Sequence, residues 1–389
     1  MSPRKFWLFS CLTLALSTAA LAWGLSQWYL SSFTKDVGDR LELLVQLRKG
    51  AVEEYFSTAQ AELQFWSTNP DILNAQQGFN KAWSESTAEA MAGKIRASYV
   101  ARNPYQGSLF QLDDAGDGTP YSALHAKLHP LTKLFVSERG YYDVFLIGAD
   151  GDVYYSVEKE KDFGSNLQSG PWRDSGLAEV YNRAVRSRHG EVYFSDMQTY
   201  GPSLGAPAIF MARALRGVGG DTLGVIAFQL PTTKILAIME YLEGMGETGE
   251  TYLVGQDKLM RSNSRFSDAV SVLAQEVDTA VVSKALAGES GVEFITDYRG
   301  VPVMSAYTSL VVGGHTWAVV AEFDREEIVS SAAQERPSLT GALLFIYGLS
   351  LWSLWYWRGR DSAGPGGGGE LADIDLDIGD LGDSSGLGS

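Results

Sequence analysis

Two long apolar segments near the two ends of this 389-residue chain limit every fold that it can adopt. The first covers residues 6–30 and the second covers residues 338–357, and neither contains a charged side chain. A helix needs about 20 apolar residues to cross the roughly 30 Å hydrocarbon core of a bilayer. The pattern therefore predicts two transmembrane helices that flank a large domain.

The residues that border these segments indicate their orientation. Arg4 and Lys5 precede the first segment, and Arg358 and Arg360 follow the second. Cytoplasmic flanks carry an excess of Lys and Arg, and aromatic rings favour the headgroup level. Such rings close both segments: Trp23, Trp28, Tyr29, Trp352, Trp355, Tyr356 and Trp357. We expect a protein of the bacterial inner (cell) membrane, with residues 1–5 and 358–389 cytoplasmic and residues 31–337 in the periplasm.

The first segment has an alternative interpretation as a cleaved signal peptide. Ala20-Leu21-Ala22 would serve as the cleavage site. The apolar character continues past that site to Leu30, which favours an uncleaved anchor.

Composition excludes several classes of function. The net charge of −16 argues against nucleic-acid binding, which requires a basic face. Four scattered histidines and a single cysteine, Cys11, offer neither a zinc site nor a disulfide in the outer region. No Ser-His-Asp order suits a catalytic triad. We expect no enzyme, no metal and no cofactor.

The outer region begins with a helical pattern and then changes to strands. Apolar residues recur at three- and four-residue spacing over residues 35–67, which predicts a helix of about 50 Å continuing the first span. Strands are predicted at residues 142–148 and 153–157, joined by the turn Asp150-Gly151. A helix at residues 84–100 comes before them. After them come a helix at residues 176–187 and strands near residues 192–195, 208–214 and 223–229.

The same order of elements is repeated about 100 residues later. Residues 251–255 and 259–262 predict a second hairpin, and residues 312–321 correspond to residues 218–227. Residues 301–304 likewise correspond to residues 206–209. Such a duplication predicts two related α+β modules with antiparallel sheets. We place a helical stalk at residues 31–69, a membrane-distal module at 70–235 and a membrane-proximal module at 236–335.

These features together resemble a known sensor family. The resemblance is carried by residues 142–156, 171–181 and 193–196, and above all by Gly246-Glu247-Thr248-Gly249-Glu250-Thr251-Tyr252-Leu253-Val254. The outer region is similar to the double Cache domain of bacterial chemotaxis receptors and sensor kinases. The resemblance implies a long helix, two PAS-like sheets and a small-molecule site in the distal module. It implies a chemoreceptor-like sensor in signal transduction; the alternative is an adaptor or structural membrane protein that has lost its ligand response.

One subgroup of the family binds amino acids and amines, and this chain matches its pattern in part. Trp172 fits the tryptophan of that pattern, and Asp196 fits its first aspartate. Arg173 stands where the pattern has a tyrosine, and Gln229 stands where it has a second aspartate.

Residue chemistry alone also suggests a small-molecule site with an aromatic floor and a few polar anchors. Arg173 would favour a carboxylate on the ligand. Tyr154 and Tyr193 have the alternative role of sheet core residues. The candidates are Tyr154, Trp172, Tyr193, Tyr200 and Gln229. The proximal module leaves a second site open, with Tyr252, Arg261, Arg265, Tyr298 and Tyr307.

The last segment, residues 358–389, is acidic and rich in glycine. Within it Ile374, Leu376 and Ile378 alternate with aspartates, a period-two pattern that could add a strand to a partner. A solvated tail is the alternative. No HAMP, kinase or methylated coiled-coil pattern follows the second span, so we expect output through a separate cytoplasmic or membrane signalling protein. We also expect a homodimer through the helix at residues 35–66.

Overall fold

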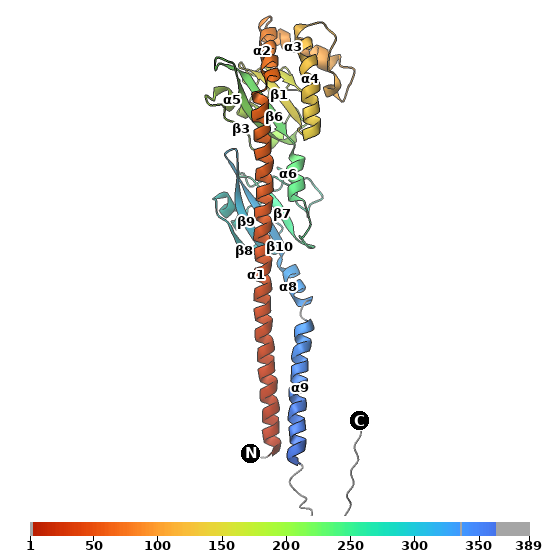
Figure 1. The fold of residues 1–389 in the computed structure, drawn as a ribbon, viewed down its shortest axis with the longest axis vertical. Coiled ribbons are helices and arrows are strands. Elements are labelled where there is room, and N and C mark those ends of the chain that lie inside the picture. The colour runs from red at the N-terminus through yellow and green to blue at the C-terminus, as the bar shows by residue number, and fades with distance from the viewer. Residues whose placement is uncertain (1–2, 335–336, 363–389) are drawn as a thin grey trace, which may run out of the picture. The chain divides into compact units, whose positions relative to one another are not determined.

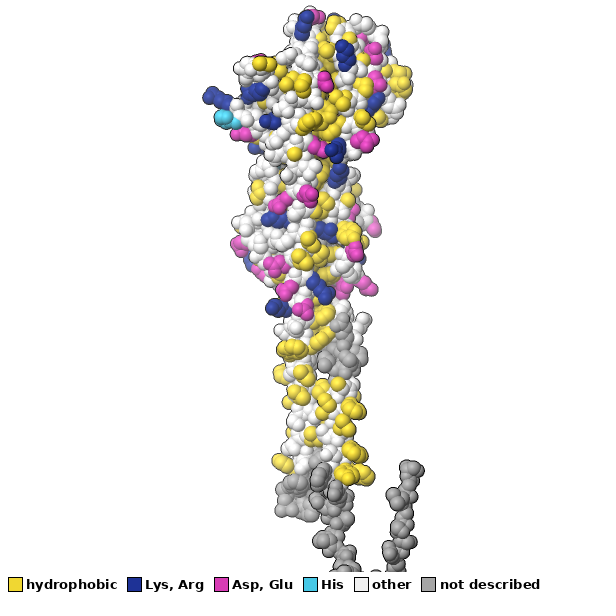
Figure 2. Space-filling model, in the orientation of Figure 1, with side chains coloured by type: hydrophobic (Ala, Val, Ile, Leu, Met, Phe, Trp, Pro, Cys, Tyr) yellow, Lys and Arg dark blue, Asp and Glu magenta, His cyan; other side chains and the backbone are white. Residues whose placement is uncertain are grey.

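A computed structural model of the protein describes residues 3–334 and 337–362, which form two compact units (Figure 1). Of the described residues, 3–29, 333–334 and 337–362 belong to the first unit, and 30–332 belong to the second. In Figure 2 the described side chains of the first unit are hydrophobic or uncharged, whereas Lys, Arg, Asp and Glu side chains are spread over the second. This division matches the chemistry of a membrane anchor and a water-exposed domain.

Helix α1, Pro3–Ser67, is one continuous helix of 65 residues. The predicted helix over residues 35–67 is therefore confirmed, and it does continue the first apolar segment. In the second unit, Leu41, Val45, Val52 and Leu63 are buried at helical spacing, so α1 packs this face against the rest of the domain. Among the described residues, α1 is the one helix long and apolar enough to cross a membrane.

Helix α9, Pro337–Ser362, covers the second apolar segment. Its described apolar stretch, Gly341–Ser353, is shorter than a full span. The second transmembrane helix thus stays a prediction.

The distal module is an antiparallel sheet between two layers of helix. Its strands are hydrogen-bonded in the order β2-β1-β6-β5-β3, and β4 pairs with β5. The strands are β1 (Asp143–Gly148), β2 (Val153–Ser156), β3 (Tyr193–Phe194), β4 (Gln198–Tyr200), β5 (Ala206–Arg216) and β6 (Thr222–Leu230). The helices are α2 (Pro70–Ser84), α3 (Ala88–Arg96), α4 (Pro120–Arg139) and α5 (Gly176–Arg186), with short helical turns at Ala97–Ala101 and Leu109–Gln111.

Strand β1 shows how this sheet separates two cores. All six of its residues are buried, because both faces of the sheet are covered. Val144 and Leu146 pack with the cluster that includes α1, α2 and α4, while Phe145 and Ile147 pack with the cluster around α5. Side chains alternate along a strand, so Asp143 shares the α5 face with Phe145.

The proximal module repeats the central strands. Its sheet order is β7-β10-β9-β8, and β7-β10-β9 corresponds to β1-β6-β5, so the duplication is confirmed for these three strands. The elements are α6 (Thr232–Met239), β7 (Glu250–Val254), α7 (Ala280–Leu286), β8 (Gly291–Thr296), β9 (Pro302–Val312), β10 (His315–Asp324) and α8 (Arg325–Gln334).

The prediction of a strand at residues 259–262 in the proximal module was wrong. Residues 259–262 form only isolated bridges, Val254 with Met260 and Leu259 with Glu276. The amide of Leu253 donates to the Ser262 hydroxyl at 3.0 Å. In a regular antiparallel ladder the Leu253 amide would donate to a backbone carbonyl of the neighbouring strand, but here it donates to a side-chain oxygen.

Candidate functional site

The seven side chains predicted for the distal ligand site do not all gather in one place. Tyr154 is buried on the face of the sheet that packs with α1, α2 and α4, and its ring centroid lies 4.4 Å from that of Trp83. Tyr200 is buried in the cluster around α5, on the opposite face. Tyr154 is therefore a core residue of the sheet, which was the alternative role that the sequence left open for it.

Three of the predicted residues lie near the surface around α5. The indole Nε1 of Trp172 donates to the Lys161 carbonyl at 3.4 Å, and its ring lies over Gly201, where any Cβ would come within 2.5 Å of it. Arg173 is exposed and pairs with Asp174 at 3.6 Å. The guanidinium of Arg183 lies over the ring of Tyr193, 4.7 Å from its centroid.

Asp196 turns to the proximal module. Its Oδ2 accepts from Nη2 of Arg261 at 2.8 Å, and its Oδ1 accepts from Nε1 of Trp317 at 2.8 Å. Burial alone would raise the pKa of Asp196, but the hydrogen bond and charge of Arg261 outweigh it and hold the pKa below its usual value. A ligand role for Asp196 stays a prediction; its contacts here join the two modules.

A set of buried polar side chains lies at one end of the α5 face, and we call it the distal polar site. Asp143 opens β1 directly opposite Gln229 on β6, so both point to this face. The Ser156 hydroxyl donates to Asp143 at 2.6 Å, and the Tyr200 hydroxyl donates to Asp162 at 2.5 Å. The members of the site are Asp143, Ser156, Asp162, Tyr200, Ser203 and Gln229.

Two acceptors in the distal polar site have no hydrogen-bond partner among the described residues. They are Oδ1 of Asp162 and Oε1 of Gln229, and both side chains are buried. The Gln229 amide nitrogen is used, because it donates to the Ser203 hydroxyl at 3.3 Å. Buried acceptors without donors cost about 1–3 kcal/mol each, so this site favours a group that brings N–H or O–H donors.

Burial also controls the charge of this site. It raises the pKa of Asp162 to about 7, with a further contribution from the charge of Glu160. It raises the pKa of Asp143 well above its usual value, and the charge of Asp162 adds to that. A nearby cation would stabilise the ionised form of both carboxyl groups.

Sequence reasoning identified Tyr200 and Gln229 but missed Asp143 and Asp162. Asp143 could have been identified from the sequence, because it is a charged residue at the start of a strand that is otherwise apolar. Asp162 gave no such signal, because it lies in the irregular segment between β2 and α5.

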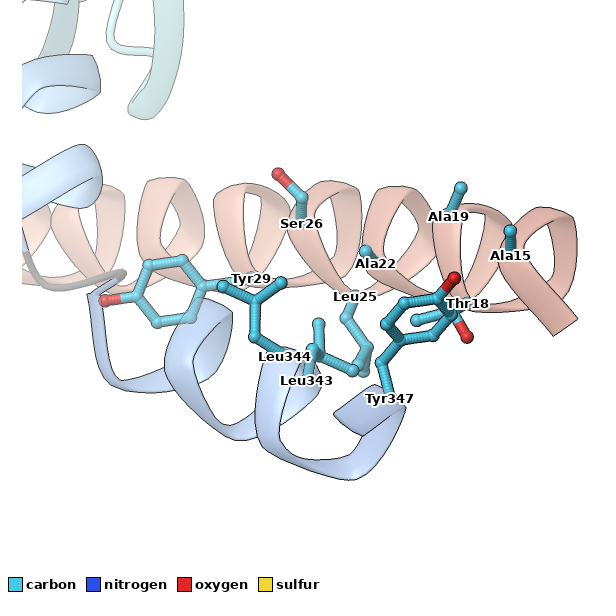
Figure 3. A pocket seen from close by; sticks show the side chains of 10 residues that line it. All are labelled: Ala15, Thr18, Ala19, Ala22, Leu25, Ser26, Tyr29, Leu343, Leu344 and Tyr347. Carbon is cyan, nitrogen blue, oxygen red and sulfur yellow. The ribbon is translucent and has the colours of Figure 1, made fainter. Parts of the chain in front are cut away.

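An apolar groove of about 380 Å³ lies between α1 and α9 in the described part of the first unit (Figure 3). No charged side chain lines it, and lipid tails or apolar helices suit such a surface. The lining residues are Ala15, Thr18, Ala19, Ala22, Leu25, Ser26, Tyr29, Leu343, Leu344 and Tyr347.

Two other predictions concern metals and the tail. Over residues 3–334 and 337–362, no group of three or more His, Cys, Asp or Glu side chains is placed to hold a metal ion. Ile374, Leu376 and Ile378 lie outside the described residues.

No protein-family model matches the chain, and no curated protein matches it. Similar solved structures are sensory domains of bacterial chemoreceptors. The ligand-binding domain of the Pseudomonas aeruginosa amino acid chemoreceptor PctB with L-Arg has 13% identity and a TM-score of 0.42, over 75% of this chain and 97% of that one. The sensory domain of the Campylobacter jejuni chemoreceptor Tlp3 with isoleucine has 13% identity and a TM-score of 0.45, over 77% and 98%. The ligand-binding domain of the Pseudomonas fluorescens chemoreceptor CtaA with L-serine has 15% identity and a TM-score of 0.36, over 70% and 99%.

Proposed function

We propose that this protein is a membrane-anchored extracytoplasmic sensor whose distal polar site binds a small molecule carrying an ammonium group. The observation that carries the proposal is the pair of buried acceptors without donors, Asp162 Oδ1 and Gln229 Oε1. An ammonium group has three N–H donors and a positive charge, so it would satisfy both acceptors and the nearby carboxylates. The helix α1, with its apolar first part, supplies the anchor.

An adaptor or structural membrane protein, the alternative function, would have no use for the distal polar site. A domain that only transmits or scaffolds gains nothing from unpaired buried acceptors, each of which lowers its stability. Trp172 is also held at the edge of the same α5 face, where its ring could contact the rest of a ligand. These features favour the sensor.

Ligand binding should appear as a thermal shift of the full-length protein in lipid nanodiscs. We expect stabilisation by some members of a set of amines and amino acids, and none by their matched analogues without the amine. A ligand at a hundred times its dissociation constant adds about 2.7 kcal/mol to the unfolding free energy. Asp162→Asn should abolish the shift, and Trp172→Ala should weaken binding by about 1–3 kcal/mol through lost ring contact.

The matched control for Asp162→Asn is Asp174→Asn, because the Asp174 side chain is 89% exposed. It should leave every ligand shift unchanged. A ligand shift that survives intact in Asp162→Asn would place the binding site elsewhere and remove the proposal.

We also propose that the protein acts as a homodimer through α1. Leu43 and Leu47 are 59% and 60% exposed on this helix, whereas Leu41 and Val45 are buried against the domain. In a background with Cys11→Ser, single cysteines at positions 43 and 47 should therefore cross-link between chains in membranes. Cysteine at position 41 is the control and should stay monomeric; equal yields at all three positions would contradict a dimer through this face.

The response would pass to a separate signalling protein, and the alternating segment with Ile374, Leu376 and Ile378 is the contact that its sequence pattern suggests. Chains truncated after Arg360 should then lose co-purification with that protein. Undiminished co-purification would leave the tail as a solvated end.

A further inference from the structure

The proximal module carries its own buried polar row at the same place in its ladder of strands. Glu322 on β10 lies directly opposite Glu250 on β7 and Ser305 on β9, so all three side chains share one face. Tyr252 follows on that face, two residues along β7. In the distal ladder the first residue of β1, Asp143, likewise lies opposite a polar residue of β6, Gln229, and both belong to the distal polar site. We call Glu250, Tyr252, Ser305 and Glu322 the proximal polar row.

Four polar atoms of this row lack a partner within the described part of the chain. They are both carboxylate oxygens of Glu322, the hydroxyl of Tyr252 and the hydroxyl of Ser305. These three side chains are no more than 1% exposed, so bulk water does not reach them. The hydroxyls of Ser305 and Tyr252 both face the Glu322 carboxylate and act to lower its pKa. The unpaired atoms therefore converge on one point.

Glu250, in contrast, is fully paired. Its Oε1 accepts from the backbone amide of Arg265 at 2.6 Å, and its Oε2 accepts from the Tyr298 hydroxyl at 2.7 Å. These bonds hold its negative charge beside Glu322 and do not neutralise it. Glu250 and Asp297 both act to raise the pKa of Glu322, which burial above all brings to about 7.

The nearby cations are directed elsewhere. The guanidinium of Arg265 donates to the carbonyls of Gly249 and Gly246. That of Arg299 pairs with Asp297 and Asp324, each at 2.6 Å. None of the ion pairs between described residues includes Glu322. The row thus has acceptors and negative charge; its own donors are the hydroxyls of Ser305 and Tyr252, and no cation of the described residues pairs with Glu322.

We infer that the proximal polar row is a second binding site, for a small primary ammonium ion. Such an ion offers three N–H donors, enough for the Glu322 carboxylate and the two hydroxyl oxygens together. Its charge would offset the carboxylates in a buried place where an unpaired charge is costly. A quaternary ammonium lacks the N–H donors, and the row lacks the three acidic or imidazole ligands of a metal site.

The segment that covers the row can provide access. Residues 255–279, between β7 and α7, contain isolated bridges and turns but no regular strand or helix. Arg265 in this segment contacts Glu250 directly. Opening this segment would break turn and bridge hydrogen bonds, such as that from the Met260 amide to the Gln275 carbonyl, but no helix and no sheet ladder.

This inference goes beyond the sensor proposal, because it concerns a different module and a different set of residues. The test uses the full-length protein in nanodiscs at pH 8 with methylammonium chloride as probe. Sodium chloride and tetramethylammonium chloride at equal ionic strength are the controls. We expect methylammonium to raise the midpoint of thermal unfolding in a saturable way that neither control reproduces.

Variants assign that shift to one module. Glu322→Gln keeps the shape of the side chain and removes the charge. It should therefore fold well and lose the rise in unfolding midpoint that methylammonium produces. Asp162→Asn changes only the distal polar site and should keep it. Tyr252→Phe removes one hydroxyl and should raise the methylammonium concentration for half-maximal effect about tenfold, as expected for one hydrogen bond to a charged group.

Three outcomes would overturn the inference: no shift up to 100 mM methylammonium, an equal shift with tetramethylammonium, or an undiminished shift in both Glu322→Gln and Tyr252→Phe. A shift that disappears in Asp162→Asn alone would likewise overturn it, while supporting the distal site. Conversely, loss in Glu322→Gln alone would support the second site even if no ligand is found for the first.

Discussion

Replacing Asp196 by alanine is expected to lower the unfolding free energy by about 3 kcal/mol, because it strands a buried guanidinium. The Arg261 side chain is 1% exposed, and Asp196 supplies the more buried of its two carboxylate partners. Removing one partner of a buried ion pair leaves the other charge without compensation. The indole N–H of Trp317 loses its acceptor in the same substitution.

The matched control is Asp257→Ala. Asp257 pairs with the same guanidinium at 2.9 Å, but its side chain is 47% exposed. Exposed ion pairs contribute at most about 1 kcal/mol, so this variant should be close to wild type. Denaturant unfolding of the full-length protein, followed by near-UV circular dichroism, measures both. Equal small losses in the two variants would show that the bridge between the modules adds little stability.

This bridge also connects the distal polar site with the proximal module. Asp196 and Tyr200 lie four residues apart in the segment that contains β3 and β4. Asp196 is held by Arg261 and Trp317, while Tyr200 donates to Asp162. A ligand that moves Tyr200 would therefore pull on a segment whose other end is bonded to the proximal module.

Local patterns predicted much of the fold. The period of α1, the hairpin at Asp150-Gly151 and the amphipathic α5 are strong signals within a short window, and all three are present. Helix α4 was missed because Pro130 lies inside it and its buried face includes His125 and His129. Helix α2 was also missed, although the N-cap Asn69 followed by Pro70 is a typical helix start.

The candidate site was harder to predict than the fold, because its contacts join distant parts of the chain. Asp162 meets Tyr200 across 38 residues, and Asp196 meets Arg261 across 65. No periodicity relates such pairs. Asp196 and Trp172 follow the order of a family pattern, yet the structure turns the Asp196 carboxylate to the other module. Order along the chain does not determine which way a loop side chain points.

The stability of Asp162→Asn relative to wild type should depend strongly on pH. The pKa of Asp162 is about 7 in the folded protein, above its usual value of 3.8, mainly because burial disfavours the charged form. The folded state therefore holds a proton that the unfolded chain releases above about pH 4. The stability that this proton brings is complete below pH 4 and is lost as the pH rises through 7. Asparagine has no such titration.

The difference in unfolding free energy, Asn variant minus wild type, should thus grow by about 4 kcal/mol between pH 4 and pH 8, at 1.36 kcal/mol per pH unit. Urea unfolding at several pH values measures it, and shared titrations such as those of Lys159 and Glu158 cancel largely in the difference. Asp174→Asn, at a position where the side chain is 89% exposed, is the control variant. Parallel curves for Asp162→Asn and wild type would mean that Asp162 is ionised at little cost in the folded protein. That result would remove the reason for a cationic ligand, since a carboxylate that is already stabilised has little need of an ammonium partner.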